Sequence, residues 1–192
     1  MKVELISLAV AGVMRVSASA YAGLLSKDEI KRTEARISKN YKAEAQSCDS
    51  RSGNAKGICV AEAKGNEKVA RAELEDRDKG TAKSRQEALV ARAEANYDVA
   101  KERCDDFAGN AKDVCIKDAQ AALTAAKADA TLARKTTDAK MTANEKISDA
   151  QTQANNAKRE TDYKAARERC DALAGSAKEM CISEAKSRFG MM

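Results

Sequence analysis

The sequence predicts an all-α protein made of elongated helical hairpins in a coiled-coil-like bundle, with each hairpin stapled by a local disulfide. Residues 23–192 contain 35 Ala but only 20 Leu, Ile, Val and Phe, about 12%, and the chain has no Pro or Trp. Alanine has the highest helix propensity, and so few bulky side chains cannot fill an ordinary core. We therefore expect thin helices that meet along seams of small residues. The second observation is a cysteine motif that occurs three times.

The charged residues are interleaved along the chain. Thirty-five Lys and Arg alternate with thirty Asp and Glu, which leaves a net charge of +5. A nucleic-acid-binding protein usually has a basic stripe with aromatic or arginine readers, and this chain has no such stripe. We interpret the charges as solvated helix faces with i,i+4 pairs, and we expect no nucleic-acid partner.

Residues 1–22 have the pattern of a secretory signal peptide. An apolar run at 5–14 follows a short basic start, and small residues with two A-x-A sites follow the run. We predict cleavage after Ala22. The apolar run is shorter than the ~20 residues that span a membrane, so we expect no stable membrane span. Glu4 and Arg15 keep open the alternative of an uncleaved amphipathic helix.

A predicted helix begins near Lys27, because Ser26 and Glu29 form the pattern of a capping box. Apolar and small residues then recur at heptad-like spacing, which predicts one buried face; they are Ile30, Ile37, Tyr41, Ala45 and Cys48.

Three segments of the chain align without gaps on the pattern Y-x6-C-D-x3-G-[NS]-A-K-x2-C. The pattern contains all six cysteines in pairs eleven positions apart: Cys48 and Cys59, Cys104 and Cys115, and Cys170 and Cys181. Eleven residues of straight helix rise about 16.5 Å, whereas a disulfide needs its Cα atoms within about 7 Å. Either the thiols stay apart or the helix folds back between them.

The middle of each segment favours a fold-back. We predict that a left-handed glycine ends the first helix of each hairpin; these are Gly53, Gly109 and Gly175. We predict that the next residue caps the second helix; these are Asn54, Asn110 and Ser176. The two cysteines of each pair lie symmetrically about this dipeptide, so an antiparallel hairpin brings them together. We therefore choose three local bridges from fifteen possible connectivities, each worth about 3 kcal/mol.

Other roles for the cysteines fit less well. A zinc site needs closely spaced Cys or His, and a catalytic thiol needs a base. The chain has no His and no C-x2-C pair. We expect no cofactor, no metal and no catalytic residue. The tyrosine seven residues before each first cysteine lies nearly two turns away on the stapled face, where we expect packing over alanine, with ligand binding as the alternative.

The connecting segments are less informative. Gly80 and Thr81 copy the hairpin turn without cysteines and predict an unstapled turn, with Gly65 and Asn66 as a competing helix breaker. Between 120 and 163 the chain is either one long helix or a partly disordered linker. An alanine-rich seam runs along it at 3- and 4-residue spacing: Ala139, Ala143, Ile147, Ala150, Ala154 and Ala157.

These features divide the chain into four parts. Residues 1–22 are the signal peptide, 23–80 the first stapled hairpin and 81–135 the second. Residues 136–192 are an alanine-rich helical or flexible segment that leads into the third stapled hairpin.

The hairpin pattern, clearest as C-D-x-L-x-G-x-A-K-x2-C between Cys170 and Cys181, resembles a group of uncharacterised proteobacterial exported proteins. These proteins are rich in Ala and Lys and are often labelled cell-envelope or TolA-like. The resemblance covers nearly the whole chain, and the cysteine hairpin is its specific part. It implies a periplasmic address and no known activity. The stretch from Thr136 to Glu160 is also similar to the Ala/Lys/Thr repeats of late-embryogenesis-abundant stress proteins.

The sequence thus favours a periplasmic or cell-envelope structural or interaction protein without catalytic activity. Its partners would be other helical proteins, a second copy of itself or envelope components. The alternative is a stress-protective or chaperone-like protein that binds unfolded clients. An enzyme is the third class, and the chain contains neither a glycine-rich phosphate loop nor a G-x-S-x-G motif to support it.

Overall fold

A computed structural model describes residues 25–191, and within that range the chain is helical, with no strand, as predicted. The expected signal peptide and its cleavage site at Ala22 lie outside these residues. The elements are α1 Lys27–Ser47, the 3-10 turn η1 Cys48–Ser50, α2 Gly53–Lys79, α3 Ala82–Cys104, α4 Gly109–Cys170 and α5 Gly175–Phe189.

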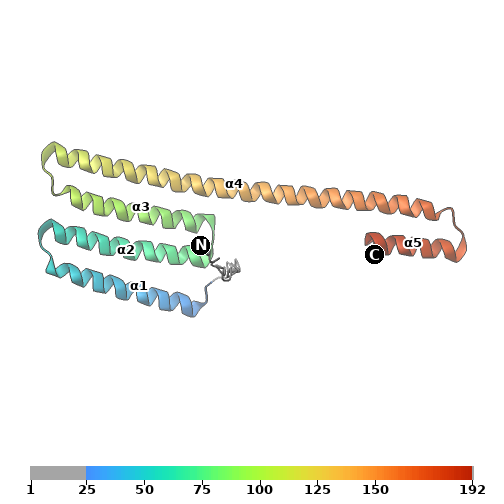
Figure 1. The fold of residues 1–192 in the computed structure, drawn as a ribbon, viewed down its shortest axis with the longest axis horizontal. Helices are drawn as coiled ribbons and strands as arrows, with labels where there is room; N and C mark the ends of the chain where they lie inside the picture. The colour runs from blue at the N-terminus through green and yellow to red at the C-terminus, as the bar shows by residue number, and fades with distance from the viewer. Residues whose placement is uncertain (1–24, 192) are drawn as a thin grey trace, which may run out of the picture.

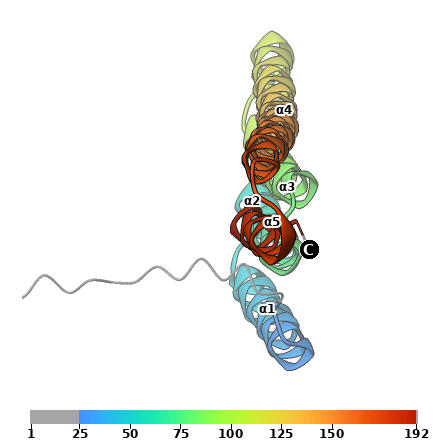
Figure 2. The same cartoon turned by 90° about the vertical axis from the view of Figure 1, so that its right-hand side faces the viewer.

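The helices form a single antiparallel row. Each helix packs against its neighbours in sequence, so that α2 lies between α1 and α3, and α3 lies between α2 and α4. Figures 1 and 2 show this order, and they show α5 folded back on the same side of α4 as α3. Because the row is one helix thick, every helix keeps two faces toward solvent.

Small side chains make up the interior of the row. The buried apolar residues within 25–191 comprise seven alanines, four cysteines and two large side chains, Ile37 and Leu74. α2 and α3 come close at Gly65 of α2, where an added Cβ would lie 2.9 Å from the Cβ of Ala95 on α3. Seams of alanine and glycine allow the helix axes to come close. The row can therefore pack although it contains few large apolar side chains.

The start of α1 confirms the predicted capping box. The Ser26 hydroxyl accepts a hydrogen bond from the Glu29 backbone N–H at 3.2 Å, and the Ser26 N–H donates to the Glu29 carboxylate at 2.9 Å. Along the predicted seam, Ile37 is buried, and Ile30 and Tyr41 are half-buried. The heptad-like pattern therefore identified the face of α1 that packs on α2.

The unstapled turn is also confirmed. Gly80 ends α2 with φ of 59°, and Thr81 caps α3 in a reciprocal pair of hydrogen bonds with Ser84. The competing breaker at Gly65 is wrong, because α2 runs through that position without interruption. At Gly65 the missing side chain serves the contact with α3 and does not end the helix.

The stretch between 120 and 163 belongs to one helix. α4 has 62 residues and runs past the expected division at 135/136, which by helical rise makes it about 93 Å long. The long-helix alternative is therefore the observed one. The alanine-rich seam is helical as expected, but all six of its residues are exposed: Ala139, Ala143, Ile147, Ala150, Ala154 and Ala157.

One carboxylate links the three inner helices of the row. Glu94 of α3 accepts hydrogen bonds from Lys127 of α4 at 2.6 Å and from Lys68 of α2 at 2.5 Å. These hydrogen bonds hold the pKa of the Glu94 carboxyl below its ordinary value, and the bond from Lys127 has the larger effect. Glu94 thus supplies a directional contact between the helices. Their seams of small residues do little to fix how the helices align.

Substitution of Gly65 by alanine should destabilise the protein. Alanine gains about 1 kcal/mol of helix propensity over glycine, but the new Cβ would force α2 and α3 apart at a cost of about 1–3 kcal/mol. Gly57 is the matched control on the same helix, because its Cβ would come too close only to the flexible end of the Glu102 side chain, which can move aside. Urea unfolding should show a loss for G65A and a gain for G57A; a gain for both would contradict the tight α2–α3 contact.

Replacement of Glu94 by glutamine should lower stability by about 1 kcal/mol at pH 7, a shift of about 2–4 °C in Tm. The folded pKa lies below the unfolded value of about 4.3, so the stabilisation is complete above that value and is lost as pH falls through the folded pKa. Melting curves of the two proteins should therefore converge near pH 2. E160Q, which removes an exposed pair within α4, should change Tm less.

Candidate interaction surface

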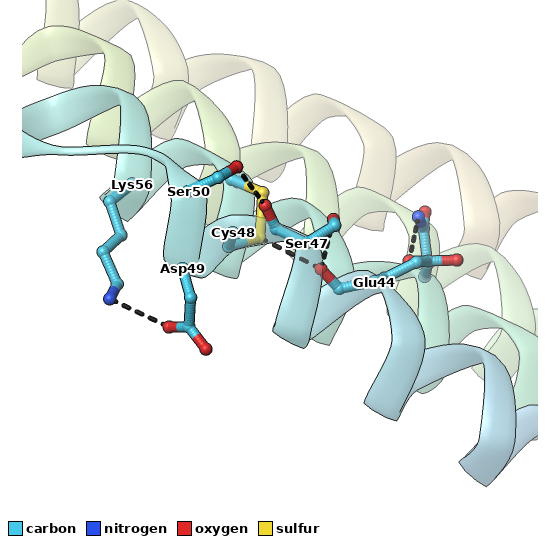
Figure 3. Close-up of a disulfide and its surroundings, with 8 residues drawn as sticks. Glu44, Ser47, Cys48, Asp49, Ser50 and Lys56 are labelled. Carbon is cyan, nitrogen blue, oxygen red and sulfur yellow. Dashed lines mark hydrogen bonds and ion pairs between the residues drawn. A yellow bond between two sulfur atoms is a disulfide. The ribbon is translucent and has the colours of Figure 1, made fainter.

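The three predicted disulfides are present. Cys48–Cys59, Cys104–Cys115 and Cys170–Cys181 have Cα–Cα distances of 5.6, 5.6 and 5.7 Å. The first cysteine of each pair is essentially inaccessible, and no cysteine is free. Figure 3 shows the first bridge at the end of α1, where the chain turns back into α2. The buried sulfurs therefore act as the apolar contact at the closed end of each hairpin.

The three turns have the same backbone geometry. The residue three positions after the first cysteine donates its N–H to that cysteine's carbonyl, at 3.0 Å in the first turn, 3.1 Å in the second and 3.0 Å in the third. The chain then passes through one extended residue and a glycine with φ of 55° to 58°. A shared sequence pattern thus gives one repeated turn.

The predicted caps of these turns are wrong in position. The glycines Gly53, Gly109 and Gly175 are left-handed as predicted, but each opens the second helix and does not end the first. The cap positions belong to Ser52, Ala108 and Ala174, and none of these makes a side-chain cap hydrogen bond. The predicted caps Asn54, Asn110 and Ser176 lie inside the first turn of each helix.

The physical reason lies in the residue before each glycine. It is extended, and its carbonyl already accepts the first helical hydrogen bond, as Ser52 does from Lys56 at 3.4 Å. A capping side chain must come from that same residue, because a cap reaches forward to the free N–H groups of the first turn. Asn54 follows too late to do so.

A second feature of the repeat was not recognised from the sequence. The Asp after the first cysteine and the Lys three residues before the second form an ion pair across every turn. The pairs are Asp49–Lys56 at 3.0 Å, Asp105–Lys112 at 2.8 Å and Asp171–Lys178 at 2.8 Å. The hydrogen bond with Asp105 raises the pKa of Lys112, and the one with Lys178 lowers the pKa of Asp171. The recurrence of D and K at fixed spacing was the signal that could have revealed this contact.

The middle of α4 is the part of the fold that no other helix covers. Half-buried or buried residues recur on one face of α4 up to Thr137 and again from Tyr163, where α5 packs. Every residue from 138 to 162 is exposed. Figure 1 shows this stretch as a bridge between the helical row and the short α5 hairpin.

Large apolar side chains are exposed on α4. Leu132 and Ile147 have 64% and 55% of their surface accessible, and both lie near the alanine seam. Across the described chain, eight large apolar side chains are exposed against two that are buried. Single exposed apolar residues are common on protein surfaces, but Leu132 and Ile147 lie on the same face of α4 as the alanines of the seam.

The titratable groups with perturbed pKa values are hydrogen-bonded to neighbouring side chains. The pKa values of Glu75 and Glu160 are lowered by hydrogen bonds from a lysine one turn along the same helix, and that of Glu29 by Ser26. The groove between α2 and α3 is crossed by the ion pairs Arg103–Glu62 and Arg92–Glu73. The Arg103–Glu62 and Arg92–Glu73 pairs link α2 to α3 across this groove, whereas the other contacts lie within a single helix or its cap.

Within residues 25–191 no cluster of three or more Cys, Asp and Glu is arranged to hold a metal ion. In the same range no helix has both the length and the apolar character for crossing a membrane. No family model, curated protein or solved structure matches the chain.

Removal of the third disulfide should release α5 alone. α5 has fifteen residues and one buried residue, Ala185, and it packs on α4 only. An isolated helix of this length is marginal in water. In the double variant C170S/C181S, hydrogen exchange should lose its protection over 175–189 and keep it over α1 to α3.

The matched control is C104S/C115S. The α3–α4 contact includes buried Ala130, the Gln86–Thr131 hydrogen bond and the Glu94–Lys127 pair, so both helices should persist with stability lower by about 3 kcal/mol. Retained protection of α5 in C170S/C181S would show that packing, not the bridge, holds it.

Proposed function

We propose that this chain is an exported, non-enzymatic structural protein of the periplasm or cell envelope, which presents the uncovered middle of α4 to other helices. The stapled row at one end and the stapled α5 hairpin at the other would act as rigid terminals of a long helical spacer. The observation that carries the proposal is the run of exposed helix from 138 to 162.

The chemistry of this run supports a role in contact with a partner. A helix that is exposed all round needs many i,i+4 ion pairs to be stable by itself. From 138 to 159 the run makes none, and Glu145 and Asp149 place like charges one turn apart. The run also contains many small residues, chiefly Ala and Thr, which let a second helix pack closely against it.

Two features support export to the periplasm. Disulfides persist in oxidising compartments such as the periplasm, and three bridges close three hairpins here. The resemblance of the C-x10-C hairpins to proteobacterial exported proteins points to the same compartment. An interior made of alanine and cysteine also gives the bridges a stabilising role that a larger apolar core would make unnecessary.

The test uses the full chain purified without reductant from the periplasmic extract of a Gram-negative host. Peptide mapping should find a new N-terminus at Gly23 and the three local bridges. Small-angle scattering should give a maximum dimension of at least about 90 Å, set by α4. The radius of gyration should exceed the value of about 16 Å that a compact domain of this size has.

An intact Met1 with free thiols would overturn the export proposal. A compact particle with the three bridges in place would overturn the spacer role and leave export standing.

A further inference from the structure

The alanine seam of α4 lies on the face opposite to its packed helices. Ala130 is the buried residue of α4 against α3. Ala139 and Ala157 follow it by 9 and 27 residues, which are about 2.5 and 7.5 turns of helix, so both point the other way. Figures 1 and 2 show α3 and α5 on one side of α4 and open space on the other. A second helix could therefore lie along this back face without displacing α3 or α5.

We infer that the back face of α4 pairs in an antiparallel arrangement with the same face of a second copy of this chain. The inference deepens the proposed function, on which it rests, by naming the partner helix. The two-fold axis would pass near residue 145, so that residues whose numbers sum to 289 or 290 lie opposite each other. Leu132 then faces Ala157 of the other copy, and Ile147 faces Ala143.

The sizes of the seam residues favour this register. Each of the two large side chains, Leu132 and Ile147, meets an alanine, and Ala139 meets Ala150. No two large apolar side chains therefore meet in this register, so the two helices can approach each other closely along the seam. Shifting the two-fold axis to the middle of α4, near residue 140, would instead place Leu132 against Ile147 and leave only small residues between them.

The charges beside the seam favour the same register. Asp129 and Lys158 lie on one flank of the seam, since 29 residues are about eight full turns. In the proposed dimer each Asp129 lies within about 4 Å along the axis of Lys158 from the other copy, and this contact occurs twice. Neither residue has an ion pair within residues 25–191. Each register also places one lysine beside its own copy, Lys146 in the proposed register and Lys140 in the shifted one, so the choice rests on the Asp129–Lys158 contact.

The overlap is long enough for a specific interface. In this register residues 121–168 of the two copies run side by side over about 70 Å, and a contact strip about 10 Å wide covers about 700 Å² on each chain. The total of about 1,400 Å² falls inside the usual range of about 1,200–2,000 Å² for stable protein–protein interfaces.

The experiment measures the mass of the full oxidised chain in solution by light scattering and sedimentation at several concentrations. The wild-type chain should have twice the mass of one copy. A139E places a carboxylate in the seam opposite Ala150 and should weaken dimerisation at least about tenfold. M141E is the matched control: Met141 is exposed two residues away on the opposite face, so this variant should remain a dimer. Circular dichroism should show equal helix content in all of these proteins.

Charge reversal tests the register independently of the seam. D129K and K158D should each weaken the dimer about tenfold at low salt, because each converts two attractive contacts into repulsive ones. The double variant D129K/K158D should return to within about twofold of wild type. Failure of this rescue, or a wild-type chain that remains monomeric at every concentration, would overturn the dimer. An elongated monomer from the periplasm would still leave the proposed spacer function in place.

Discussion

The disulfide at the closed end of each hairpin is the constraint on which the rest of the structure depends. A Cα–Cα distance of 5.6–5.7 Å requires two helices to come close at the turn, and alanine beside the bridge permits that approach. Each bridge lowers the conformational entropy of the unfolded chain, which stabilises the folded hairpin by about 3 kcal/mol. This contribution matters here because only Ile37 and Leu74 supply large buried apolar side chains within the described residues.

The local nature of these bridges explains the single row. Each joins helices adjacent in sequence, and within residues 25–191 α1 does not pack on α3, nor α2 on α4. Lateral order therefore comes from close contacts such as Gly65 on Ala95, and from polar links such as Glu94 between Lys68 and Lys127. A row of this kind leaves both faces of its helices accessible, and α5 is too short to cover the remainder of α4.

The exposed middle of α4 follows from the same arrangement. The helix is held at both ends, by α3 over nearly its first half, up to about Thr137, and by the stapled α5 hairpin at its last turns. Between these contacts its back face carries alanine, Leu132 and Ile147 at helical spacing. A seam of this type is complementary in size to itself when reversed, which is why we assign it to a second copy of the chain and not to a small ligand.

The sequence by itself determined the helices, the three bridges, the cap at Ser26 and the turn at Gly80, because each depends on residues within about a dozen positions of one another. It misplaced the caps at Asn54, Asn110 and Ser176, since the extended residue before each glycine takes that position only once the turn is built. It left open the state of residues 120–163 and the exposure of Ala139 to Ala157. Both depend on which other helices pack on α4. Alanine seams are too uniform for the local sequence to specify those packing partners.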